Sequence, residues 1–224
     1  MKPYQSVPIV ECGEPLAAIP LDLFAVVTPH PYVAAGADYG DRHDPYFLRE
    51  VVLRRLIAAQ ACLQKIHVDL SMQIFDAYRP IVVQQFMVDY TFAQLKGDRQ
   101  LDGRETEKIW EKVYQFWAAP SDNLETPPPH STGAAVDLTI VRDSGLVLDM
   151  GGEIDEIGDR SHPDYYADSP KPVEQHYHAN RVLLRTVMAK AGFVQHKNEW
   201  WHFSYGDQMW AWQKGKAIAH YGRI

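Results

Sequence analysis

The sequence predicts an α+β fold in which a small antiparallel sheet, flanked by several helices, carries the functional site. Some segments alternate apolar and polar residues as strands do, whereas longer segments repeat their apolar residues at helical spacing. These segments occur in blocks rather than in strict strand–helix alternation, which favours α+β over a parallel α/β sheet. At 224 residues we expect a single domain, 1–224, in which residues 1–44 form an irregular lead-in and a loop that lines the cleft.

The first half of the chain contains two predicted strands and three predicted helices. Asp44 followed by Pro45 resembles a helix start, with an N-cap residue before a proline at the first helical position. The residue before a proline favours extended geometry, so Arg79 is expected at a strand end, pointing outward. The expected elements are a strand near 23–27, a helix over 45–66, a strand at 72–77, a helix over 81–95 and a helix through 109–117.

The second half begins with a proline-rich loop and ends with a predicted hairpin. A long polar segment, 151–172, is rich in Gly, Asp and Pro and is long enough to be a functional loop. The expected elements are a strand at 134–141, a turn at 142–145 into 146–150, a helix over 173–191, and strands at 193–196 and 201–205.

A carboxylate lies within the predicted strand 134–141. Side chains alternate along a strand, so Val136, Leu138 and Ile140 should face the core while Asp137 faces the other side among small residues. A buried carboxylate is costly without a partner, and a metal ion is one such partner. The turn at Gly133 could bring His130 back toward Asp137.

Near the C-terminus, Glu199 and His202 supply another carboxylate and another imidazole. Two histidines and one aspartate form a three-ligand set for zinc, and catalytic zinc sites typically leave the fourth position to water. Residues three apart on a regular strand face opposite sides, so Glu199 is expected on the turn before the strand that carries His202. We expect the fold to bring these residues together with His130 and Asp137.

Four motifs occur in order along the chain: Phe75–Pro80, His130-x-x-Gly133-x-Ala135-x-Asp137, Met150–Asp155 followed by Arg160–His162, and Glu199-x-x-His202. Together they resemble the D-alanyl-D-alanine dipeptidases of the vancomycin-resistance type, a group of zinc D,D-peptidases in peptidase family M15. The resemblance covers most of residues 45–205. At one position the chain departs from it: where the family usually has a serine two residues before the first histidine, this chain has Pro128.

The resemblance implies a set of roles for individual residues. Glu199 matches the catalytic base that takes a proton from the attacking water and later serves the leaving amine. Arg79 matches the residue that stabilises the oxyanion, and Asp155 matches the carboxylate that meets the free amino group of the substrate. One zinc ion per chain is implied, with the ligands His130, Asp137 and His202.

Composition narrows the classes of partner. The net charge of −7 and the pI near 5.8 argue against nucleic acid or an anionic membrane as a partner. No apolar run approaches the roughly 20 residues of a membrane span, and the N-terminal stretch does not resemble a signal peptide. Two cysteines far apart do not suggest a disulfide scaffold. We therefore expect a cytoplasmic protein with a small dipeptide substrate.

The leading hypothesis is a zinc-dependent dipeptidase that hydrolyses D-alanyl-D-alanine or similar D,D-dipeptides by means of a zinc-activated water. A D,D-carboxypeptidase acting on peptidoglycan peptides is a second possibility. A zinc-bearing binding module without catalysis, as in the related Hedgehog signalling domain, is a third; a structural zinc would need neither Glu199 nor Arg79. The exact dipeptide, the oligomeric state and the physiological role stay open.

Overall fold

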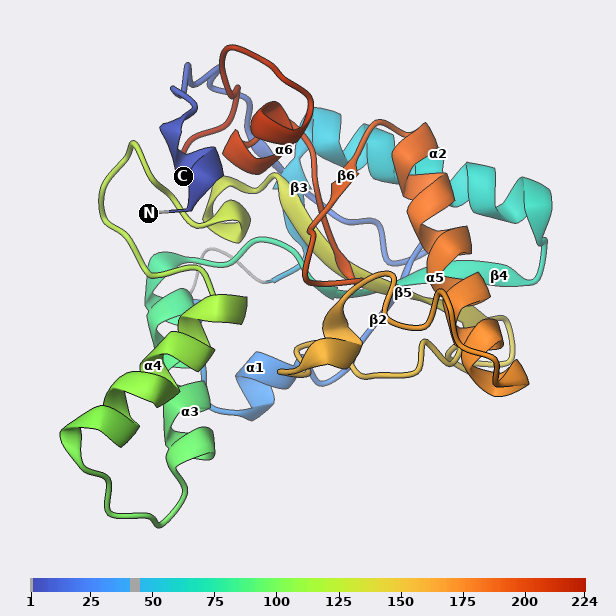
Figure 1. The fold of residues 1–224 in the computed structure, drawn as a ribbon. Coiled ribbons are helices and arrows are strands. Elements are labelled where there is room, and N and C mark those ends of the chain that lie inside the picture. The colour runs from blue at the N-terminus through green and yellow to red at the C-terminus, as the bar shows by residue number, and fades with distance from the viewer. Residues whose placement is uncertain (1, 41–44) are drawn as a thin grey trace.

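A computed structural model describes residues 2–40 and 45–224. Its centre is a five-stranded sheet in the order β2-β4-β5-β7-β6, which lies in the middle of Figure 1. The strands are β2 (Ala25–Val26), β4 (Leu70–Asp76), β5 (Ala135–Arg142), β6 (Val194–Gln195) and β7 (His202–Ser204). The α+β prediction is confirmed, with one correction: β2 runs parallel to β4, whereas the other neighbouring strands are antiparallel.

One face of the sheet packs against two long helices, α2 (Glu50–Ile66) and α5 (Pro172–Lys190), seen together on one side of the sheet in Figure 1. Val136, Leu138 and Ile140 of β5 belong to this core and are fully buried, as their alternation predicts. The opposite face of β5 therefore carries Asp137. That face holds the polar residues described below.

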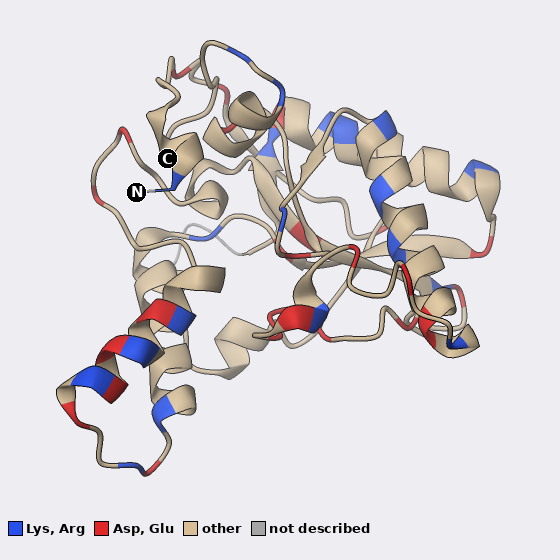
Figure 2. Cartoon of the chain, viewed as in Figure 1, with Lys and Arg blue, Asp and Glu red and all other residues tan. Residues whose placement is uncertain are grey.

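Two antiparallel helices, α3 (Ile81–Lys96) and α4 (Gly103–Phe116), form a lobe that projects from the sheet (Figure 1). A separate apolar cluster joins them to the short helix α1 (Pro31–Ala34) and includes Trp117. The charged residues of α4 form bands of both signs along the helix in Figure 2, whereas its apolar residues pack toward α3. The C-terminal end of α4 lies at the pocket that contains Asp137.

The two ends of the chain meet beside the sheet. The 3-10 turn η1 (Pro3–Ser6) packs against α6 (Gln208–Gln213), and Tyr4 and Trp210 share one apolar cluster. The side-chain amide of Gln208 in α6 donates to the Val7 carbonyl at 2.7 Å. This contact ties residues just after β7 to the first residues of the described chain.

The structure corrects several predicted boundaries. The helix predicted over 45–66 begins at Glu50, because Phe47–Arg49 forms β3, which pairs with β1 (Leu16–Ala18). Asp44, the predicted N-cap, lies outside the described residues. Beyond the predicted turn, 146–150 forms only a single bridge, Val141 to Val147. The other predicted strands and helices are confirmed to within a few residues, and the sequence did not predict α1, β1, β3 and α6. Both cysteines are free, and within the described residues no helix is long and apolar enough to cross a membrane.

Candidate active site

Asp137 and His202 face each other across neighbouring strands. In the register of β5 and β7 they are direct partners, so their side chains leave the same face of the sheet. Asp137 Oδ1 lies 3.0 Å from His202 Nδ1. Only 2% of Asp137 and 5% of His202 are exposed to solvent. The predicted pair is thus brought together by strand pairing alone.

His130 reaches the pair from the 3-10 turn η2 (Pro129–Thr132). Gly133 follows with φ of 68°, a left-handed conformation that glycine adopts without strain, and it reverses the chain into β5. His130 Nδ1 is 2.7 Å from the Ala77 carbonyl, which can only accept, so this nitrogen donates. The Nε2 lone pair of a neutral ring is then directed toward Asp137 Oδ2, 3.2 Å away.

The three side chains lie close enough together to share one metal ion. Zinc bonds of ~2.0–2.1 Å in a tetrahedron place ligand atoms about 3.3 Å apart. Asp137 Oδ1 is 3.0 Å from His202 Nδ1, Asp137 Oδ2 is 3.2 Å from His130 Nε2, and the two nitrogens are 3.1 Å apart. The ligand atoms, one from each residue, all lie within 4.8 Å of one another. Asp137 Oδ1 is buried and accepts no hydrogen bond among the described residues. A cation at this point would satisfy that oxygen.

The ionisation state of Asp137 also favours a bound metal ion. Burial acts to raise the pKa of Asp137, but the imidazoles of His130 and His202 outweigh it and hold the pKa well below its usual range. The carboxylate is therefore ionised at neutral pH. An ionised carboxylate and two imidazoles form a donor set that is typical of catalytic zinc.

Arg79 is buried in the site, which corrects the expectation that it points outward; 4% of the residue is exposed. Its Nε donates to Asp76 at 2.9 Å, Nη1 to Gln84 Oε1 at 2.9 Å and Nη2 to the Tyr32 hydroxyl at 3.0 Å. The guanidinium also lies 4.9 Å from the ring centre of Trp117. Burial acts to lower the pKa of Arg79, but Tyr32 and Asp76 raise it, so the cation is permanent.

Asp76 was present in the quoted motif, but the sequence assigned it no role. It is completely buried between Arg79, bound at 2.7 Å, and His30, 3.3 Å away. Tyr39 donates to it at 3.1 Å. Asp76 therefore fixes the position of Arg79, and only the tertiary structure shows this, because His30 and Tyr39 lie in the lead-in before α2.

Glu199 lies on the turn before β7, as predicted, and faces His202 across that turn. Its Oε2 is 3.8 Å from His202 Nδ1 and its Oε1 is 3.4 Å from His196 Nδ1. Burial raises the pKa of Glu199 well above its usual range, Asp137 adds to this, and Lys2 opposes it. A carboxyl group with a raised pKa, held beside the proposed ligand set, is suited to accept a proton and to return it.

Asp155 closes another side of the site. It accepts a hydrogen bond from the Tyr32 hydroxyl at 2.7 Å. Its φ of 64° is unusual for a residue other than glycine, and such strain is found mostly where a side chain must be aimed. Burial, followed by repulsion from Asp137, raises the pKa of Asp155 to about 6.

One pocket contains all six predicted site residues. It also takes in residues that the sequence did not single out, among them Lys2 and Tyr4 from the N-terminal segment and Trp117 from the end of α4. The pocket is lined by Lys2, Tyr4, Arg79, Gln84, Phe116, Trp117, Ala118, Pro129, His130, Asp137, Asp155, His196, Glu199, Trp201 and His202.

Known proteins are similar to most or all of this chain. A D-alanyl-D-alanine dipeptidase of Synechocystis is 48% identical over 241 residues, covering 100% of this chain and 97% of that protein. One of Streptomyces coelicolor is 30% identical over 170 residues, covering 74% and 78%. A solved structure of the vancomycin-resistance D,D-pentapeptidase VanY, with Zn(II), aligns with a TM-score of 0.47 at 14% identity, covering 95% and 96%.

The sequence also matches the family described as D-ala-D-ala dipeptidase (peptidase M15) over residues 26–219. That match spans every element that positions the pocket except the N-terminal segment. The family match and the Synechocystis relative together show that the whole chain is related to these dipeptidases. The chain belongs to the D-Ala-D-Ala dipeptidase family of peptidases.

Proposed function

We propose that this protein is a zinc-dependent dipeptidase that hydrolyses D-alanyl-D-alanine or a similar D,D-dipeptide. The convergence of three buried ligand side chains carries the proposal, because their ligand atoms lie within 4.8 Å of one another and two imidazoles with a carboxylate are a donor set that zinc takes. His130, Asp137 and His202 would hold one zinc ion. Membership of the dipeptidase family supports the substrate class, and the alignment over the whole chain supports one functional unit spanning 1–224.

When bound, zinc supplies Lewis-acid polarisation of the scissile carbonyl and lowers the pKa of water. Glu199 takes the proton of the attacking water, which its raised pKa favours, and then delivers that proton to the leaving amine. The proton therefore moves from water to the amine nitrogen as the amide C–N bond breaks. The carboxyl group is regenerated as a carboxylate.

Arg79 stabilises the negative charge that develops on the carbonyl oxygen. Its guanidinium is held by Asp76, Gln84 and Tyr32, so it needs no reorganisation during the reaction. Asp155 pairs with the ammonium group of the substrate. An ammonium beside this partly buried carboxylate favours its ionised form, which a blocked amino group would not do.

A panel of dipeptides tests the proposal. Purified protein loaded with zinc should hydrolyse D,D-dipeptides much faster than L,L- or L,D-dipeptides, with product amino acids measured by chromatography. It should also prefer a free over an N-acetylated D,D-dipeptide, because the acetylated form leaves Asp155 unpaired. Hydrolysis of longer D,D-peptides at the rate of dipeptides would instead indicate a carboxypeptidase. No hydrolysis of any member of the panel would contradict the proposal.

A further inference from the structure

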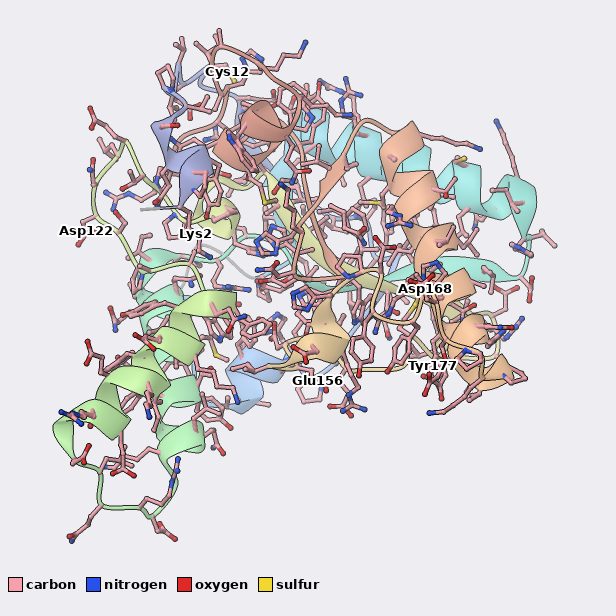
Figure 3. All side chains as sticks on the ribbon, in the orientation of Figure 1. Lys2, Cys12, Asp122, Glu156, Asp168 and Tyr177 are labelled. Carbon is pink, nitrogen blue, oxygen red and sulfur yellow. The ribbon has the colours of Figure 1, made fainter. Side chains whose placement is uncertain are left out.

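The N-terminal segment contributes a cation to the catalytic pocket. Lys2 and Tyr4 line the pocket together with Glu199 and His196. Figure 3 labels Lys2 between η1 and the lobe formed by α3 and α4. η1 is held there by its packing on α6, which follows β7 directly. The fold therefore brings the first described residues next to the strand that carries His202.

Lys2 forms no ion pair within the described residues. Among residues 2–40 and 45–224, no ion pair joins its ammonium group to a carboxylate, although the side chain is partly buried. Arg79, by contrast, already binds Asp76 at 2.7 Å. Burial lowers the pKa of Lys2 and Glu199 opposes that effect, so the two charges interact electrostatically across the pocket. A cation of this kind is suited to an anion supplied by a ligand.

The chemistry of peptide cleavage determines which part of the substrate lies beside Glu199. A group that returns a proton to the leaving amine must lie next to that nitrogen. In a dipeptide the terminal carboxylate is separated from this nitrogen by only one carbon atom. The end of the substrate near Glu199 is therefore its carboxylate end, whereas Asp155 faces the ammonium end.

We propose that Lys2 binds the terminal carboxylate of the dipeptide, with the Tyr4 hydroxyl as a second donor. The inference rests on the proposed dipeptidase function. Tyr4 is 7% exposed, and within the described ranges its hydroxyl donates no hydrogen bond. Pro128 and Pro129, which precede His130, have no backbone N–H to offer. The N-terminal segment thus supplies the donors that this proline run lacks, and it makes the site selective for a free carboxylate.

The test compares a D,D-dipeptide with its C-terminal amide in zinc-loaded protein. The wild type should prefer the free acid in kcat/KM by about 10–100-fold, the range that a charged hydrogen bond supplies. Lys2→Met keeps most of the aliphatic stem, and it should raise KM for the acid much more than KM for the amide. Lys2→Arg should retain most of the preference, and Tyr4→Phe should lose a smaller part. Lys65→Met, an exposed lysine of α2, is the matched control.

Two results would overturn the inference while leaving the proposed function in place. If Lys2→Met lowers kcat equally for acid and amide, Lys2 acts on Glu199 and not on the substrate. If the wild type does not distinguish acid from amide, no carboxylate is bound by a charge at all. Hydrolysis of neither compound by the wild type would instead overturn the proposed function, and this inference with it. Circular dichroism of each variant distinguishes a folding defect from a loss of substrate binding. If Lys2→Met fails to fold, the acid-over-amide preferences of Lys2→Arg and Tyr4→Phe test the inference in its place.

Discussion

Three residues from three separate elements form the proposed ligand set, and each should be needed for the metal. His202→Ala or Asp137→Ala removes one of three protein ligands and leaves the others in a buried site, so bound zinc should fall from about one per chain to a small fraction. Metal analysis by plasma mass spectrometry after dialysis checks this. His176→Ala, a substitution at an exposed position of α5, should keep full occupancy. Full occupancy in the His202 variant would contradict the assignment.

The candidate metal ligands could be predicted from sequence because only a few residue types, at suitable spacing, can bind a metal ion. Asp137 was identifiable as a carboxylate in an apolar strand, and Glu199 as a residue that must lie off the strand. Asp76 and Tyr32 could not be assigned. Their roles depend on contacts between segments with no sequence relation to each other, such as the hydrogen bond from Tyr32 to Asp155.

At the scale of elements, a bulge in β4 explains why Asp76 faces the site. Ile74 pairs with Leu138, so a regular antiparallel register would place Phe75 opposite Asp137. The register shifts between Ile74 and Asp76, and Asp76 becomes the partner of Asp137 instead. The extra residue turns the carboxylate from the core face to the site face. A strand pattern in sequence shows alternation but not such a shift.

Long-range pairing also explains the helix boundary that sequence placed wrongly. Phe47–Arg49 continues a helical apolar pattern, yet its backbone pairs with β1 from the lead-in. Arg49 then donates to the Thr132 carbonyl at 2.9 Å, which anchors the turn that carries His130. Local propensity cannot reveal a partner strand 30 residues away along the chain, and tertiary pairing overrides it.

The loop that carries Asp155 begins at Gly151, and we expect this glycine to be required for both stability and substrate binding. Gly151 has φ of 74°, and an added Cβ would lie 2.4 Å from a Tyr177 ring atom and 2.5 Å from a Tyr166 ring atom. Gly151→Ala should therefore lower the free energy of unfolding by more than the ~1–2 kcal/mol of a left-handed alanine alone. It should also raise KM for a dipeptide, because the loop carries Asp155. Urea denaturation and steady-state kinetics measure both effects.

Gly215→Ala is the control for that prediction. Gly215 has φ of 62°, but an added Cβ would meet nothing within 4 Å. The variant should lose only the stability that a left-handed alanine costs, because its Cβ meets no neighbouring atom. Its KM for a dipeptide should be unchanged. Equal loss of stability in the two variants would mean that the rings of Tyr166 and Tyr177 move aside, and the packing argument would be wrong.

For the whole molecule, the proposed ligands join segments that are distant in the chain, so metal binding should stabilise the entire fold. At free zinc about 100-fold above its dissociation constant, binding adds ~2.7 kcal/mol to the folded state. For a chain of this size that corresponds to about 5–10 °C in the unfolding temperature. Thermal unfolding with zinc and with a chelator should show this difference. The His202→Ala variant should lose the response, and an equal response in it would place the stabilising zinc elsewhere.

The most direct test of catalysis is the rate and metal content of Glu199→Ala. Glu199 is assigned to proton transfer and not to zinc binding, so the variant should be folded and should contain as much zinc as the wild type. A positioned acid–base group contributes roughly 10²–10⁴-fold to the rate, so hydrolysis of D-alanyl-D-alanine should be slower by at least about two orders of magnitude. Near-normal hydrolysis by zinc-loaded Glu199→Ala would contradict the mechanism. Loss of activity together with loss of zinc would instead make Glu199 a ligand.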